Sequence, residues 1–134
     1  MADIKRHGKD VTIVSFGKII KLAQEAAETL AKEGIDVEII DLRTVRPIDY
    51  DTVIDSVKKT NRLVCLEEAW PLGSISTEIA YMVQKRAFDH LDAPIVRLTT
   101  ADTPAAYAPT LMEAFLPSVG GVIKAVKDAM YLNS

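Results

Sequence analysis

Polar residues that can bind ligands or transfer protons follow the apolar segments of this chain. They stand at 15–17 (Ser-Phe-Gly), 41–43 (Asp-Leu-Arg), 67–68 (Glu-Glu) and 99–102 (Thr-Thr-Ala-Asp). If the apolar segments are parallel strands, these groups meet at one edge, because ligands in open parallel sheets bind at the carboxyl ends of the strands. Each group is therefore a candidate site, with a simpler alternative beside it.

Ser15, Gly17 and Lys18 form the first candidate, an anion-binding site at the start of a predicted helix. Backbone amides at a helix N-terminus have no partner within the helix and attract anions. The segment contains neither GxGxxG nor GxxxxGK[ST], so a plain strand–helix turn at Gly17 is the alternative.

Arg43 and Arg46 form the second candidate, since a guanidinium group can bind a carboxylate or a phosphate through two parallel hydrogen bonds. The alternative is a surface network in which the two arginines pair with Asp41 or Asp49. Both interpretations stay open on the sequence.

Glu67 and Glu68 adjoin Trp70, the only tryptophan of the chain. Adjacent strand residues point to opposite faces, so at most one glutamate faces a given neighbour. Acid–base catalysis needs a raised pKa and a substrate pocket, and the sequence indicates neither. We expect one glutamate to accept hydrogen bonds from a neighbouring loop or partner chain. Trp70 is a candidate contact anchor, or it covers the edge of the domain's own core.

The remaining reactive side chains are scattered. Cys65, His7 and His90 show no spacing typical of a metal site, and Cys65 is expected to be a small buried hydrophobic residue. No nucleophile stands beside a base. The sequence therefore predicts no catalytic residue, cofactor-binding residue or metal ligand in this chain.

Composition limits the class of protein. The chain has 134 residues, 49% of them hydrophobic, and 16 Lys and Arg against 19 Asp and Glu. The absence of a basic excess argues against nucleic-acid binding, and no apolar run approaches the ~20 residues of a membrane span. The N-terminus lacks the apolar centre of a secretory signal, and one cysteine suits a reducing compartment. We expect one intracellular domain over residues 1–134.

Short β-branched runs alternate with longer helical stretches, which predicts a parallel sheet with helices on both faces. A fifth strand at 3–6 is expected to lie antiparallel at an edge, with Gly8 allowing the reversal; its partner strand stays open. Asp49, Ser74 and Ser118 are predicted N-caps, and Gly34 a left-handed C-terminal stop. The predicted strands span 11–16, 37–40, 62–66 and 95–98. The predicted helices span 18–32 and 75–88, and three further helices are expected after Asp49, between Thr110 and Pro117, and after Ser118.

Five stretches resemble one known family. They are DLRTVRPID at 41–49, KTNRLV at 59–64, EEAWP at 67–71, AFDHLDAP at 87–94 and ADTPAAYA at 101–108. Together they resemble the transketolase C-terminal domain class, as it occurs in beta subunits of thiamine-diphosphate-dependent pyruvate dehydrogenases. The likeness runs in order from about Asp3 to Tyr131.

The resemblance implies a three-layer α/β/α fold whose mixed, mostly parallel sheet has five strands. It also implies that the antiparallel strand lies beside the third strand and not beside the second. The implied activity, of the whole enzyme, is oxidative decarboxylation of pyruvate with transfer of the acetyl group to a lipoyl arm.

The same resemblance implies that thiamine diphosphate and magnesium bind outside this domain, between the alpha subunit and the N-terminal domain of the beta subunit, which this chain lacks. Asp41, Arg43, Arg46, Glu67, Glu68 and Trp70 then become interface candidates. The implied partners are that N-terminal domain, the alpha subunit, a second beta subunit and the subunit-binding domain of the dihydrolipoyl acyltransferase. The implied location is the bacterial cytoplasm or the mitochondrial matrix.

The chain departs from the usual pattern at several places, among them the turn after Trp70-Pro71, which is usually rich in glycine and here contains Ser74, Ser76 and Thr77. Ala69 stands where related subunits have glycine, and Thr100 stands where glycine often precedes Ala-Asp. The departures leave open a beta-subunit domain of a branched-chain 2-oxo acid dehydrogenase. A separate alternative, of a different class, is a stand-alone α/β module that binds a small molecule or anion.

Overall fold

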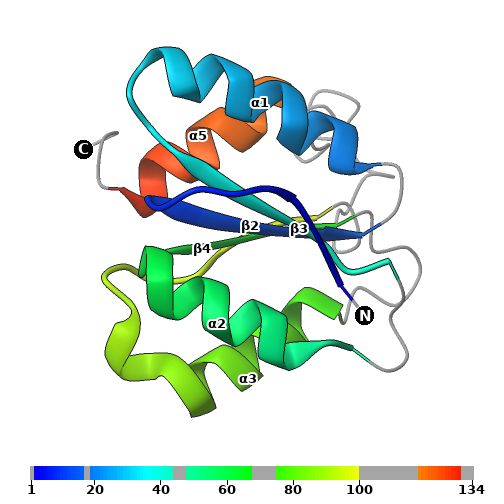
Figure 1. Cartoon of the computed structure of the whole chain (residues 1–134), viewed down its shortest axis with the longest axis vertical. Coiled ribbons are helices and arrows are strands. Elements are labelled where there is room, and N and C mark those ends of the chain that lie inside the picture. The colour runs from blue at the N-terminus through cyan, green and yellow to red at the C-terminus, as the bar shows by residue number, and fades with distance from the viewer. Residues whose placement is uncertain (1, 17–18, 44–47, 68–74, 100–117, 131–134) are drawn as a thin grey trace, which may run out of the picture.

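Three layers make up the fold, with a mixed sheet between two pairs of helices (Figure 1). The computed structural model describes residues 2–16, 19–43, 48–67, 75–99 and 118–130. Helices α1 and α5 cover one face of the sheet, and α2 and α3 cover the other. The predicted three-layer fold is thus confirmed. The helices are α1 (Ile20–Lys32), α2 (Tyr50–Thr60), α3 (Ile75–Ala87), the 3₁₀ turn η2 (Phe88–His90) and α5 (Val119–Ala129).

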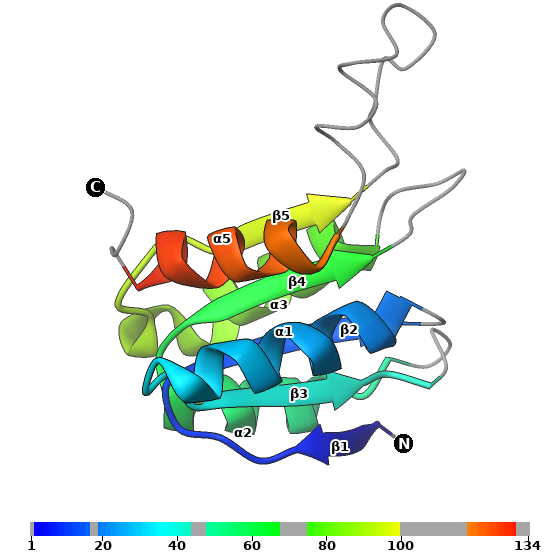
Figure 2. The same cartoon turned by 90° about the horizontal axis from the view of Figure 1, so that it is seen from above.

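The sheet has five strands in the order β1-β3-β2-β4-β5 (Figure 2). All neighbours are parallel except β1, which runs antiparallel to β3 and not to β2, as the resemblance implied. The strands are β1 (Asp3–Arg6), β2 (Val11–Phe16), β3 (Val37–Asp41), β4 (Leu63–Glu67) and β5 (Val96–Thr99), each within one residue of its predicted bounds.

Gly8 lies between β1 and β2, where the sequence predicts a residue that permits reversal. Its φ is not positive, and its backbone instead passes very close to β3. A Cβ atom at this position would lie 2.3 Å from the carbonyl carbon of Val37 and 2.6 Å from the amide nitrogen of Glu38. The close approach, and not a turn conformation, is what requires glycine here.

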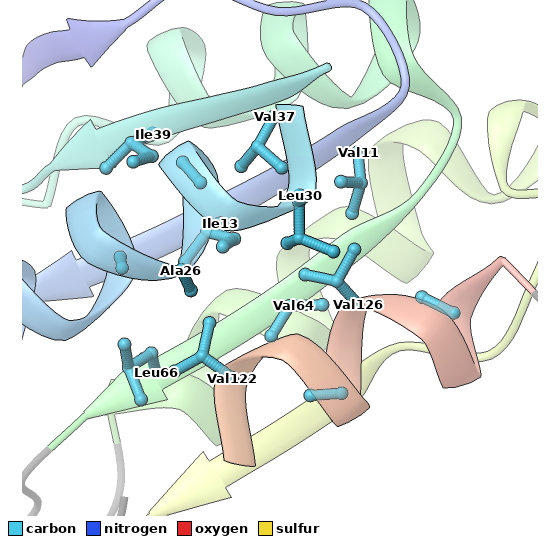
Figure 3. Close-up of a cluster of buried hydrophobic side chains, with 14 of the residues drawn as sticks. Val11, Ile13, Ala26, Leu30, Val37, Ile39, Val64, Leu66, Val122 and Val126 are labelled. Atoms are coloured by element: carbon cyan, nitrogen blue, oxygen red, sulfur yellow. The ribbon is translucent and has the colours of Figure 1, made fainter. Parts of the chain in front are cut away.

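Two apolar clusters fill the spaces between the layers. The cluster shown in Figure 3 lies between the sheet and α1 and α5. The second cluster lies between the sheet and α2 and α3, and it includes Cys65, which is buried as predicted. Strand residues alternate between the clusters, which is the period-two pattern of a sheet covered on both faces. On β2, for example, the first cluster takes Val11 and Ile13 while the second takes Val14.

Side-chain caps fix two helix starts as predicted. Asp49 accepts a hydrogen bond from the amide of Thr52 at 3.2 Å, and Ser118 accepts one from the amide of Gly121 at 3.0 Å. Gly34 follows α1 with a φ of +83°. The predicted cap Ser74 and the predicted helix between Thr110 and Pro117 lie outside the described residues.

The end of α3 corrects one prediction. The helix predicted over 75–88 includes Phe88, but α3 ends at Ala87 and Phe88 is 66% exposed. Phe88 instead begins the 3₁₀ turn η2, and nine residues after the buried Ile79 it would lie about half a turn from the buried face even on a continued α-helix. Ala87, four residues after Val83, takes the buried position instead. None of the described helices is long and apolar enough to span a membrane.

Candidate functional site

The carboxyl edge of the sheet gathers those predicted site residues that the structure describes. Ser15 of β2 is in register with Asp41 of β3 on one side and with Leu66 of β4 on the other. The backbone of Glu67 pairs with Phe16 at the same edge. Five further candidates, Gly17, Lys18, Arg46, Glu68 and Trp70, lie outside the described residues.

A tight turn follows β3 at this edge. The amide of Leu42 donates to the carbonyl of Ser15 at 3.0 Å, and the amide of Arg43 donates to Oδ1 of Asp41 at 2.9 Å. Arg43 has a φ of +64°, a left-handed backbone conformation that residues other than glycine rarely adopt. The described residues thus show Asp41 bound by the backbone of Arg43 and not by its guanidinium group. The turn presents an exposed arginine on a strained backbone.

Asp3 of β1 pairs with Asp41 in register, so the N-terminal end of β1 also lies at this edge. Its carboxylate forms a 2.9 Å ion pair with Lys5. The hydrogen bond from Lys5 is the main reason that the pKa of Asp3 lies below 3.8, and the charge of Arg43 lowers that pKa further. The carboxylate of Asp3 is therefore balanced mainly by Lys5 of its own strand, with a smaller contribution from Arg43 in the turn.

Ser15 differs from the other buried hydroxyl-bearing residue of β2. Its side chain is almost completely buried, yet Oγ has no hydrogen-bond partner within the described structure. Thr12 is equally buried, but its hydroxyl pairs with Ser56 and Thr60 of α2 at 2.7 Å each. Buried polar atoms in folded proteins are nearly always paired, so the hydroxyl of Ser15 requires an explanation.

Sequence reasoning missed a buried carboxylate at the opposite edge of the sheet. Glu38 of β3 has a side chain only 1% exposed, and it accepts hydrogen bonds from the amide of Gly8 at 3.0 Å and from Oγ of Ser56 at 2.7 Å. It also forms an ion pair with Lys59 of α2. The signal in the sequence was a single acidic residue inside an otherwise apolar strand, Val-Glu-Ile-Ile.

The contacts of Glu38 decide its charge. Burial is the largest single influence and favours the neutral acid, but the hydrogen bonds from Lys59, Ser56 and Gly8 together outweigh it. The pKa of Glu38 therefore lies below its ordinary value of 4.5. A carboxylate held ionised by three donors is suited to joining elements together and not to donating a proton.

A shallow polar hollow of about 280 Å³ lies where α2 and α3 end. Its lining mixes cations with the acidic Asp89, and Arg86 already pairs with Asp51 at 2.8 Å. Cationic side chains are common at helix C-termini, where they complement the dipole. The hollow is lined by Lys58, Lys85, Arg86, Ala87, Phe88, Asp89 and His90.

No catalytic constellation is formed by the side chains that the structure describes. His7 is exposed and 3.9 Å from Glu38, His90 lies at the hollow, and Cys65 is buried in β4. Within the same residues, no group of three His, Cys, Asp or Glu side chains could hold a metal ion. The described part of the carboxyl edge is polar and partly strained, with one unpaired buried hydroxyl.

Two curated relatives of this chain have closely similar names. The chain is 49% identical over 132 residues to "Pyruvate dehydrogenase E1 component subunit beta, mitochondrial" of Dictyostelium discoideum, covering 98% of this chain and 37% of that protein. It is 54% identical over 130 residues to "Pyruvate dehydrogenase E1 component subunit beta" of Rhizobium meliloti (strain 1021), covering 97% and 28%. The chain thus spans well under half the length of these curated relatives.

Solved structures share the fold. "Split gene transketolase, inactive beta4 tetramer" superposes with a TM-score of 0.82 at 28% identity, covering 100% of this chain and 43% of that one. A 2-oxoglutarate:ferredoxin oxidoreductase from Magnetococcus marinus has a TM-score of 0.64 at 13% identity, which shows the fold alone. Residues 1–122 match the family described as Transketolase, C-terminal domain. This chain belongs to the transketolase C-terminal domain family.

Proposed function

We propose that this chain is the C-terminal domain of the beta subunit of pyruvate dehydrogenase E1 and that its role is assembly. The observation that carries the proposal is identity of about half the residues, over nearly the whole chain, with such subunits from a bacterium and from a mitochondrion. In this proposal residues 1–134 form one domain. The complete enzyme oxidatively decarboxylates pyruvate and acetylates the lipoyl group of the acyltransferase, with thiamine diphosphate and magnesium held outside this domain.

The carboxyl edge is the surface proposed to contact the rest of the enzyme. Asp41 and Arg43 stand there beside the strand ends of Ser15 and Glu67, without a catalytic set among the described side chains. The antiparallel course of β1 brings Asp3 to the same edge. Arg46, Glu68 and Trp70 are proposed to extend this surface.

The proposed partners follow from the family. They are the N-terminal domain of the same subunit, the alpha subunit, a second beta subunit and the subunit-binding domain of the acyltransferase. The proposed location is the bacterial cytoplasm or the mitochondrial matrix, and relatives from a bacterium and from a mitochondrion support it.

A chimeric enzyme tests the assembly role. This chain replaces the matching segment of the Rhizobium meliloti beta subunit, which is produced together with its alpha subunit. Light scattering should give the same mass as the unmodified enzyme, and pyruvate should be decarboxylated. A chimera that folds, as judged by circular dichroism, but stays unassembled contradicts the proposal.

The chain alone provides a second test. Calorimetric titration with thiamine diphosphate and magnesium should give no saturable heat, whereas micromolar binding would favour a stand-alone module. Light scattering with the acyltransferase's subunit-binding domain then reports whether the chain binds that domain by itself. To separate pyruvate from branched-chain 2-oxo acids, both substrates are compared in the native enzyme that contains this chain.

A further inference from the structure

Two large aromatic side chains lie in solvent along α3 and the turn that follows it. Tyr81 is 64% exposed and Phe88 is 66% exposed, and in the described part of the chain no other large hydrophobic side chain is exposed. Seven residues make about two helical turns, so both positions lie on one side of the helix axis, away from the buried Ile79. Aromatic residues are enriched in protein–protein contacts, so this pair marks a candidate interaction surface.

Phe88 also borders the polar hollow at the ends of α2 and α3, two helices that lie on the same face of the sheet (Figure 1). Lys85, which lines the hollow too, follows Tyr81 by four residues and precedes Phe88 by three. Residues with this spacing are neighbours on a helix surface. Tyr81, Lys85 and Phe88 therefore form one stripe, called here the α3 stripe, which leads into the hollow.

The hollow is cationic although the chain as a whole is acidic. Its lining carries three positive charges, from two lysines and an arginine, against one negative charge on Asp89, whereas the whole chain has a net charge of −3. Arg86 is already paired with Asp51. Lys58 and Lys85 form no ion pair or side-chain hydrogen bond with another residue that the structure describes. Two positive charges from different helices are thus available to an external anion.

The helix dipoles explain only part of this pattern. Cations complement the negative end of a helix, and Lys58 and Lys85 both stand in the last turn of theirs. The dipoles give no reason for Phe88 to lie in solvent at the same hollow. Aromatic anchors surrounded by polar groups are typical of surfaces that bind another protein.

The hollow and the carboxyl edge lie at opposite edges of the sheet. Helix α2 leads into β4, and η2 leads into β5, so the hollow stands where these two parallel strands begin. The surface proposed for assembly stands where strands end. A partner can therefore occupy the hollow without competing for the carboxyl edge.

We propose that the α3 stripe and the hollow form a docking surface for an acidic segment of a partner protein. Carboxylates of that segment pair with Lys58 and Lys85, and one of its apolar side chains packs against Phe88. Charge complementarity selects this class of partner, because the lysines repel a basic segment, and a wholly apolar segment would desolvate them without compensation. The inference is independent of the proposed assembly role.

An acidic peptide with two apolar residues, Glu-Glu-Leu-Glu-Phe-Glu-Glu, is the probe. Amide NMR of the chain, titrated with this peptide, should show saturable shifts at Lys58, Lys85 and Phe88. Added salt should weaken binding, because exposed charges are screened. The same peptide with Lys in place of every Glu should not bind. The version with Ala in place of Leu and Phe should bind about fivefold more weakly or worse, because the apolar anchors are lost.

Variants of the chain provide a matched pair. Lys58→Glu combined with Lys85→Glu should raise the dissociation constant of the acidic peptide about tenfold or more, because two attractions become repulsions. Lys21→Glu combined with Lys32→Glu changes the net charge equally at exposed positions of α1, on the other face of the sheet, and should have little effect.

Phe88→Ala tests the aromatic anchor. It should weaken binding of the acidic peptide about fivefold. The unfolding temperature should stay nearly unchanged, because Phe88 is exposed and its removal leaves no cavity. Full binding by this variant, or equal binding of the Ala-substituted peptide, would show charge attraction alone and overturn the proposal.

Other occupants are distinguished by two further measurements. If light scattering shows a dimer that Phe88→Ala abolishes, a second copy of this chain covers the surface and the proposal is wrong. The chimeric enzyme carrying Lys58→Glu and Lys85→Glu should assemble as the unmodified chimera does. Loss of assembly in this variant alone would assign the surface to the enzyme's own subunits. A native chain that gives no saturable response to the acidic peptide also overturns the proposal.

Discussion

Lys59, in the last turn of α2, binds the carboxylate of Glu38 inside β3. The Glu38 side chain is 1% exposed, whereas the Lys59 side chain is 46% exposed, so the pair joins the interior to the surface. The same carboxylate accepts the amide of Gly8, in the link between β1 and β2. One buried charge on β3 therefore connects the link between β1 and β2 to helix α2.

Removing either charge should destabilise the fold. Glu38→Gln should lower the free energy of unfolding by about 1–3 kcal/mol, because hydrogen bonds to a charged group are weakened while the shape is kept. Lys59→Met should cost a comparable amount by leaving the carboxylate with fewer donors. Lys58→Met, at the exposed neighbouring position, is the control and should change stability by no more than about 0.5 kcal/mol. Urea unfolding followed by circular dichroism measures all three, and equal effects of the two lysine changes would argue against a structural pair.

Acid should remove part of the stability. The pKa of Glu38 in the folded chain is below 4.5, so its contribution is complete above that value and is lost as the pH falls through the folded pKa. Asp49 behaves in the same way below 3.8, mainly because the hydroxyl of Thr52 donates to it. Urea midpoints measured from about pH 6 down to about pH 3 should therefore fall. The decline should be shallower for Glu38→Gln, and parallel curves would show that Glu38 does not contribute.

Two glycines should respond oppositely to alanine. Gly8→Ala places a Cβ 2.3 Å from the Val37 carbonyl carbon, so β1 or β3 must shift, and a loss of about 2 kcal/mol or more is expected. Gly120→Ala in α5 meets no atom within 4 Å and should stabilise the chain by up to about 1 kcal/mol. Thermal unfolding of both variants provides the comparison. A neutral Gly8→Ala would mean that the close approach to β3 is easily relaxed.

The left-handed backbone of Arg43 should lower the stability of the chain, whereas its guanidinium group should contribute to contact with other parts of the enzyme. Arg43→Gly relieves the left-handed backbone and should be about 1 kcal/mol more stable than Arg43→Ala, which keeps it. Both variants lose the guanidinium group, so both should weaken assembly of the chimeric enzyme to a similar extent. Unfolding measurements and light scattering test the two effects separately. Normal assembly of both variants would remove Arg43 from the proposed interface.

Local patterns predicted the parts of the fold that depend on neighbouring residues. The apolar alternation of β2 and the capping side chains of Asp49 and Ser118 act within a few positions, so the sequence displays them directly. The placement of β1 beside β3 came only from the resemblance to a family. A simple reversal at Gly8 gives no reason for β1 to bypass β2.

The features that the sequence did not predict depend on contacts between residues that are far apart in the chain. Glu38 and Lys59 are 21 positions apart, and their pairing depends on how α2 crosses the sheet. The unpaired state of Ser15 depends likewise on what packs around the end of β2. The predicted helix end at residue 88 was wrong by one residue for a local reason, since the change from α-helix to 3₁₀ turn has no clear marker in the sequence. The sequence therefore predicted which strand ends form the candidate site, but it did not predict the hydrogen bonds and ion pairs between their residues.

The bypass of β2 by the first strand constrains the order of folding. Asp3 meets Asp41 only after the intervening chain has built β2, α1 and β3. Closing so long a loop is entropically costly, and the edge strand gains nothing until its template exists. The first residues should therefore join last during refolding and open first in hydrogen exchange. The central strands β2 and β3 should therefore form first, and the N-terminal strand β1 should be added to the sheet last.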